Sequence, residues 1–364
     1  MGKDALRERP FEKLRRRAGG EAFDEATVRN WYIARAYVLD KLKDTAFTPG
    51  QNAHLHVVVD GDSPLMLALV RQTALCAHYL NFVEYDQFDR LACSNRSVIT
   101  IVSGKAGIAD ELRKEEFLCN LMQCCKYSIY GKTANEDSYL DVEVEVVKDA
   151  AHEGAIVYTE EDVKAFLAGK PEEEIFTVDT RKAKLAHRIY GLGGVIDNIP
   201  YEDIFGVGRY SQALDVFRDV ILKDDEDVSI EISDIICTDC FESRERAVSM
   251  LCPGYSKLGT RAKRAVWEKN NQALSLSEHS RWVVEKLIMG FRPYTNRERI
   301  CYANLFGAER KALCAQLKKN ASSPAHIDLC SYKELRRTDP DNLKYDSFLM
   351  LAVPLILEQI RKKS

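Results

Sequence analysis

The chain has 364 residues, of which 46% are hydrophobic, and its 52 Lys and Arg nearly balance its 56 Asp and Glu, leaving a formal charge of −4. A chain of this length buries two or three cores, since domains cluster near about 100 to 150 residues. The balanced charge argues against bulk binding of nucleic acid, which requires a concentrated basic face, although local basic patches such as residues 13–17 remain.

No targeting or membrane segment is indicated. The N-terminus mixes acidic with basic residues and lacks a seven-residue apolar core, so it predicts neither a signal peptide nor a transit peptide. An apolar stretch at residues 348–357 is interrupted by Pro354 and is shorter than the roughly 20 residues that cross a bilayer. We therefore expect a cytoplasmic protein without membrane insertion, in which this stretch forms a buried closing helix.

The eleven cysteines predict no disulfide framework, because they are scattered and an odd number cannot pair completely. We expect reduced, mostly buried thiols. Cys237 and Cys240 form a C-x-x-C motif beside Cys252, but a structural zinc normally needs four ligands, and no second C-x-x-C or H-x-x-x-H is present. The sequence predicts no metal site and identifies no cofactor.

Residues 1–50 predict an N-terminal helical arm. Within it, Val28, Trp31 and Leu42 fall on one apolar helical face, and Thr-Pro-Gly at residues 48–50 ends the helix.

Residues 51–180 predict an α/β domain with a mainly parallel, Rossmann-like sheet. Apolar or alternating strands are expected at residues 54–60, 97–102 and 139–147, with a long buried helix at residues 64–79 between the first two. Strands that alternate with helices indicate parallel pairing.

The turn after the first strand is the candidate phosphate site. Gly61, Asp62 and Ser63 stand where a dinucleotide fingerprint would carry G-x-G, but only the first glycine is present, and Met66 occupies a position that needs a small residue. Ordinary NAD binding is therefore not expected. A helix that begins at Ser63 still suits a phosphate, because its first N–H groups and its dipole favour an anion.

Other polar residues near the sheet have two interpretations each. Asp60 and Asp62 either hold a metal or a ribose hydroxyl, or are ordinary turn formers. Lys105 follows Ser-Gly without the earlier glycine of a phosphate loop, which favours a solvated loop lysine. Glu143 and Glu145 share one face of a strand, where they either serve acid–base chemistry or form its solvated side.

Residues 181–272 predict a helical connector, with helices at residues 210–222 and 243–251. The glycine run at residues 191–194 is more typical of a helix end than of a phosphate cradle. The basic segment 257–264 is interpreted as a linker and hinge before the last domain.

A helix is predicted over residues 277–289. Ser275 and Glu278 have capping-box spacing, Trp282 belongs to an apolar stripe at helical spacing, and Gly290 ends the helix.

The order of motifs from this helix onward resembles the RyR domain, a small helical module repeated in ryanodine receptors and present as a single copy in prokaryotic proteins. The resemblance implies an RyR-like domain at residues 273–364, and such modules are read as ligand-sensing or interaction units. Prokaryotic RyR modules often accompany a nucleotide-binding domain of the kind that gates potassium transport, which the degenerate turn at Gly61 also resembles. The matching positions are Glu278, His279, Trp282, Gly290, His326, Leu329, Tyr332, Leu335 and Asp346.

Candidate ligand-binding residues combine flat aromatic faces with groups that meet phosphate, a set suited to a small nucleotide-like ligand. An alternative interpretation fits the sequence equally well, in which the aromatic residues belong to the core and the basic residues face solvent. The candidates are Arg281, Trp282, Arg292, His326, Tyr332 and Tyr345.

We therefore expect a cytoplasmic ligand sensor or regulatory binding protein, rather than an enzyme, in which the ligand shifts the population of domain arrangements. An enzyme acting on a nucleotide at the Gly61 turn and a protein-interaction scaffold remain alternatives. Homo-oligomers and a role in antiviral defence also stay open.

Overall fold

The computed structural model describes residues 25–85, 88, 90–135, 138–149, 153–176, 181–190, 209–222, 232–251, 257–320 and 322–363. Several sequence predictions lie outside this part of the chain. They concern the basic patch at residues 13–17, the glycine run at residues 191–194 and Cys252, and the side chains of Cys237 and Cys240 are likewise not described.

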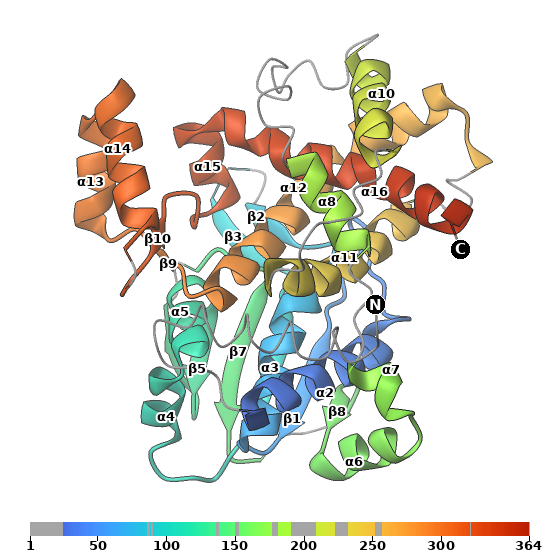
Figure 1. Cartoon of the computed structure of the whole chain (residues 1–364). Coiled ribbons are helices and arrows are strands. Elements are labelled where there is room, and N and C mark those ends of the chain that lie inside the picture. Colours follow the sequence, from blue (N-terminus) through green and yellow to red (C-terminus); the bar gives the residue numbers. More distant parts are fainter. Residues whose placement is uncertain are drawn as a thin grey trace.

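A six-stranded, mostly parallel sheet forms the lower half of the molecule and confirms the mixed α/β class (Figure 1). The strand order is β6-β5-β7-β4-β1-β8, and the β5–β6 pairing is the antiparallel one. The strands are β1 (His56–Asp60), β4 (Ser97–Val102), β5 (Lys126–Ile129), β6 (Lys132–Ala134), β7 (Val142–Val147) and β8 (Ile156–Tyr158).

Side-chain alternation explains the two sides of β7. Val142, Val144 and Val146 are buried on one face of the strand, whereas Glu143 and Glu145 are half-buried on the opposite face. Lys126 pairs with Glu143 at 2.6 Å, and the Thr100 hydroxyl donates to Glu145 at 2.5 Å. Both carboxylates therefore have structural partners on neighbouring strands.

The helix after β1 begins as predicted. Ser63 is the N-cap of α3 (Pro64–Cys76), its hydroxyl accepts a hydrogen bond from the Met66 amide, and Pro64 takes the first turn. Helix α2 (Glu25–Leu42) packs on α3, which in turn contacts β1 and β4. Helices α4 (Ile108–Lys114) and α5 (Glu116–Cys124) connect β4 to β5.

A second group of helices lies over the amino-terminal edge of the parallel strands, opposite their arrowheads (Figure 1). The Arg246 side chain joins the two halves by donating to the Cys76 carbonyl, at the end of α3, at 2.6 Å. Helices α6 (Glu160–Ala168) and α7 (Glu172–Phe176) stay in the lower half beside the sheet, whereas α8 (Arg181–Tyr190), α10 (Arg209–Leu222) and α11 (Ile232–Leu251) belong to this second group (Figure 1).

The helix start predicted at Ser275 is wrong. A single helix, α12, runs from Thr260 to Ile288, so Ser275 lies in its interior and bonds the Ser347 hydroxyl at 2.8 Å. Most of the predicted hinge at residues 257–264 is the first turn of this helix. The predicted end is correct, because Gly290 adopts a φ of 84° that a side chain disfavours.

The boundary drawn between residues 272 and 273 falls inside α12, and the hydrophobic core crosses it. Val283, Leu287 and Leu329 belong to the same buried cluster as the strands of the sheet. The C-terminal segment is therefore not separated from the sheet by an exposed linker.

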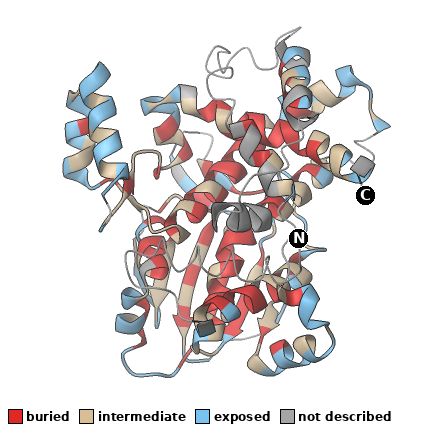
Figure 2. Cartoon of the chain, viewed as in Figure 1, coloured by how far each residue is buried: buried red, intermediate tan, exposed pale blue. Residues whose placement is uncertain are grey.

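Small elements complete the C-terminal part. The hairpin of α13 and α14 projects from the body and is largely exposed (Figure 2). Helix α16 contains Pro354, as predicted for the closing helix, and among the described residues no helix is long and apolar enough to span a membrane. The C-terminal elements are β9 (Arg292–Pro293), α13 (Asn296–Asn304), α14 (Gly307–Lys318), β10 (Ala325–His326), α15 (Tyr332–Thr338), the 3-10 helix η3 (Pro340–Asn342) and α16 (Leu343–Lys363). A separate antiparallel pair, β2 (Val83–Tyr85) and β3 (Leu91–Ser94), comes from the earlier part of the chain.

Candidate functional site

The turn after β1 is filled by its own side chains. Gly61 has a φ of 131°, and a Cβ there would lie 3.4 Å from Cγ of the buried Met66. The Asp62 carboxylate accepts a hydrogen bond from the Ser103 hydroxyl rather than from its own backbone. Met66 thus fills the space between helix and strand that the third glycine of a dinucleotide fingerprint would leave free for close packing.

An internal carboxylate stands at the start of α3. The Ser63 hydroxyl donates to Glu160 at 2.7 Å, and this bond lowers the pKa of Glu160. An anionic side chain therefore already meets the helix end that was predicted to meet phosphate, and Asp62 adds a second carboxylate nearby. This arrangement opposes a further anion at Gly61, Asp62 and Ser63.

Lys105 is a half-exposed loop lysine, as interpreted from sequence. It pairs with Glu111 at 2.7 Å, and this hydrogen bond raises the pKa of Lys105. Its amide donates to the Ser103 hydroxyl, which holds the loop in place.

A different site lies in the C-terminal part, where a cavity of about 220 Å³ opens between α12, α14, α15 and α16. This volume is below the roughly 300–1,000 Å³ of sites for drug-sized ligands, so it suits a small ligand or one end of a larger ligand. The lining residues are His279, Trp282, Lys318, His326, Asp328, Leu335, Asn342, Tyr345 and Asp346.

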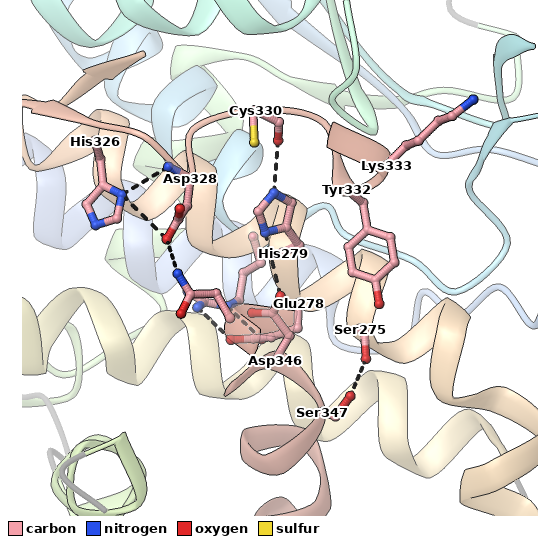
Figure 3. Close-up of polar contacts among 12 residues, drawn as sticks. Ser275, Glu278, His279, His326, Asp328, Cys330, Tyr332, Lys333, Asp346 and Ser347 are labelled. Atoms are coloured by element: carbon pink, nitrogen blue, oxygen red, sulfur yellow. Dashed lines mark hydrogen bonds and ion pairs between the residues drawn. The ribbon is translucent and has the colours of Figure 1, made fainter. Parts of the chain in front are cut away.

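His279 and Asp346 form a buried pair at this cavity (Figure 3). His279 Nε2 donates to the Cys330 carbonyl at 2.9 Å, and its Nδ1 lies 3.6 Å from Oδ2 of Asp346. Burial acts to lower the pKa of His279, but the interactions with Asp346 and Cys330 outweigh it and raise that pKa. Burial also raises the pKa of Asp346, against the opposing influence of His279. The pair therefore holds a proton tightly.

His326 and Asp328 form a second contact in the lining of the cavity (Figure 3). The Asp328 amide donates to Nδ1 of His326 at 3.2 Å, which places the ring hydrogen on Nε2. Burial, with Lys318 and Lys286 nearby, lowers the pKa of His326 to about 3, so the ring is neutral. Burial and Asp339 raise the pKa of Asp328 to about 6.

The Trp282 ring is half-buried and already makes several contacts. His279 stacks on it with ring centroids 6.1 Å apart, the His326 ring meets it edge-on at 5.0 Å, and Nζ of Lys286 lies 5.7 Å from its centroid. A ligand in the cavity therefore meets the part of this ring that its neighbours leave exposed, together with Tyr345.

The structure brings three of the predicted ligand residues together at the cavity, namely Trp282, His326 and Tyr345. Tyr332 is buried behind it, with its ring 5.9 Å from that of His279. Neither Arg281 nor Arg292 lines the cavity. Arg292 lies elsewhere, and its guanidinium is engaged by Glu298 at 2.8 and 2.9 Å and by Ser323 at 2.8 Å.

Arg281 belongs to a buried ion network instead. It donates to Glu278 at 2.7 and 2.9 Å and to Glu285 at 2.6 Å. Arg244 of α11 donates to the same Glu278 through two bonds of 2.9 Å. Burial acts to raise the pKa of Glu278, but the two guanidinium groups outweigh it and lower that pKa to about 2. This network joins α11 to α12 and keeps Arg281 from reaching a ligand.

Sequence reasoning missed Lys318, Asp328 and Asn342 as lining residues. His279 and Asp346 were matched to the family pattern but were not selected for the site. Lys318 ends α14 and Asn342 ends η3, so only the fold brings them together. Among the described side chains, no group of three or more metal-ligating residues is close enough to hold an ion.

Chemically, this cavity offers two carboxyl groups, the neutral imidazole of His326, the imidazole of His279 paired with Asp346, an amide, the cation of Lys318 and aromatic edges. No family model matches the chain, and neither a curated protein nor a solved structure matches it.

Proposed function

We propose that this chain is a regulatory ligand-binding protein whose RyR-like segment binds a small nucleotide-like ligand in the cavity beside Trp282. In this proposal the sheet half is a degenerate Rossmann-like domain, and the C-terminal helices are the RyR-like domain. The observation that carries the proposal is the convergence of aromatic, hydrogen-bonding and charged side chains from separate elements on one cavity of about 220 Å³. Cavities of this composition, with perturbed pKa values, are the usual ligand sites of proteins.

The chemistry of the walls suits the parts of a nucleotide. Trp282 and Tyr345 offer aromatic surface to a base, the Nε2–H of His326 offers a donor, and the amide oxygen of Asn342 offers an acceptor. Lys318 is exposed at the mouth, where its cation can meet a phosphate in water.

The position of α12 supports a regulatory role. This helix presents His279 and Trp282 to the cavity and buries Val283 and Leu287 in the core that contains the sheet. A ligand that binds one placement of α12 more tightly than another would shift the population of both halves together.

A melting-temperature screen with nucleotides, cyclic oligonucleotides and ADP-ribose derivatives tests the proposal. A ligand at about 100 times its Kd should stabilise the folded chain by about 2.7 kcal/mol. Lys318→Ala should weaken binding of a phosphorylated ligand, with a smaller loss at high salt. Lys319→Ala is the matched control, because Lys319 is exposed and adjacent but does not line the cavity.

The screen, together with assays of turnover and of partner capture, separates the alternatives. Equal stabilisation of Lys318→Ala and Lys319→Ala by a phosphorylated ligand would show that this ligand binds outside the cavity. Turnover that is lost on Asp62→Asn would favour an enzyme at the Gly61 turn. No stabilisation by any ligand, with capture of a partner through the C-terminal part, would favour a scaffold.

A further inference from the structure

Two carboxyl groups with little solvent exposure face the same cavity, which is an unusual arrangement for a site that binds a phosphorylated ligand. The side chains of Asp328 and Asp346 are 13% and 8% exposed. Within the described part of the chain, neither is paired with an Arg or a Lys. Because burying a carboxylate is costly unless donors satisfy it, these groups favour a ligand rich in N–H donors.

Asp346 has a partner in His279, whereas Asp328 is satisfied less completely. Asn342 Nδ2 donates to Oδ2 of Asp328 at 2.9 Å. His326 Nδ1 lies 3.8 Å from the same oxygen but is an acceptor, so it cannot donate to Asp328. Among the described residues, none donates a hydrogen bond to Oδ1 of Asp328.

The nucleobases differ in what they offer to a carboxylate. Guanine presents its N1–H and its 2-amino group side by side, which matches the two oxygens of one carboxylate. Adenine and cytosine each present an amino group beside a ring nitrogen with a lone pair, and uracil presents one N–H between two carbonyls. A carboxylate accepts hydrogen bonds only, so it repels those lone pairs.

We infer that the cavity is selective for a guanine base, whose N1–H and 2-amino groups donate to the carboxylate of Asp328. This inference rests on the proposed function, since it names the base of the ligand at that site. The Nε2–H of His326 offers a donor to the acceptor atoms of the same base, and Lys318 at the mouth offers a cation to its phosphate. A cavity of about 220 Å³ suits a base inside and a phosphate outside.

The ionisation of Asp328 makes the inference sensitive to pH. Its pKa of about 6 reflects burial and the Asp339 charge, opposed by Lys318, His279 and the Asn342 bond. Below that pH, protonated Asp328 presents one donor in place of an acceptor. His326, with a pKa near 3, stays neutral between pH 7 and pH 5, and although burial acts to lower the pKa of His279, the interaction with Asp346 raises that pKa, which favours the protonated ring. Guanine binding should therefore weaken as pH falls through about 6.

The test is calorimetric titration of the full chain with GMP, IMP, XMP and AMP. IMP lacks only the 2-amino group, and XMP carries a carbonyl in its place. Wild type should bind GMP at least about tenfold more tightly than the other three, the discrimination expected of a two-bond base contact. Asp328→Asn should invert this preference to XMP, because the amide nitrogen donates to the carbonyl while the amide oxygen accepts from N1–H. Asp346→Asn should change affinity for all four ligands together and keep the preference for GMP.

The outcomes separate this inference from the proposed function. Equal binding of GMP and AMP by wild type, or an Asp328→Asn chain that loses affinity without inverting its preference, would overturn guanine selectivity and leave a nucleotide site. No binding of any nucleotide to the folded chain would remove the proposed function as well. If Asp328→Asn does not fold, wild-type affinity for GMP at pH 7 and pH 5 decides, and equal affinity at both would overturn the inference.

Discussion

Replacing Glu278 by Gln should destabilise the chain by about 3–5 kcal/mol, the cost expected when one partner of a buried ion pair loses its charge. Glu278 is buried and accepts four hydrogen bonds of 2.7–2.9 Å from Arg244 and Arg281. Gln has one acceptor oxygen and two N–H donors, so the substitution leaves two buried guanidinium groups without their full partner. The pKa shift from 4.5 to about 2 gives an independent figure of about 3 kcal/mol, at 1.36 kcal/mol per unit.

Urea denaturation of wild type and Glu278→Gln at pH 7 measures this cost. The contribution of Glu278 is complete above its unfolded pKa of 4.5 and is lost as pH falls toward 2, because the folded pKa is depressed. Asp215→Asn is the matched control, since Asp215 pairs with Arg218 at 2.9 Å on an exposed surface and should cost less than about 0.5 kcal/mol. A loss below about 1 kcal/mol in Glu278→Gln would refute the buried network.

Three further outcomes follow from the fold. Calorimetry should detect no tight binding of NAD or NADP, because Met66 and Glu160 fill the turn after β1, and sub-micromolar affinity would contradict this. Residues 273–364 alone should not form a protected core, because this fragment loses Arg244 and half of α12, and slow hydrogen exchange in it would count against the shared core. Wild-type stability should fall relative to that of Asp328→Asn by about 2 kcal/mol as pH rises from 4 to 7, because the raised pKa of Asp328 favours the protonated folded state, and parallel urea midpoints would show otherwise.

Local signals predicted the elements whose ends are set by local chemistry. Ser63 and Pro64 fixed the start of α3, and the alternation of valine and glutamate identified β7. Ser275 and Glu278 have the same spacing as a capping box but lie inside α12, where Ser275 bonds Ser347 of α16 and Glu278 bonds Arg244 of α11. Spacing alone cannot tell a helix start from a helix interior.

The actual capping box of the C-terminal part joins Thr295 to Glu298, at the start of α13.

Arg281 shows why the binding residues were harder to predict. Its neighbours at helical spacing, Glu278 and Glu285, would also be compatible with a solvated face, and the partner that buries the group, Arg244, is 34 residues from Glu278. The cavity is likewise assembled from residues that only the tertiary fold brings together.

Hydrogen exchange of the full chain, with and without the nucleotide that gives the largest melting shift, tests the central claim most directly. A ligand in the cavity should slow exchange at residues 325–342 and along α12, whose amides flank His279 and Trp282. Residues 61–63 and 103–107, at the opposite edge of the sheet, should be unchanged. Slower exchange confined to those two turns, with none at the cavity, would contradict the account.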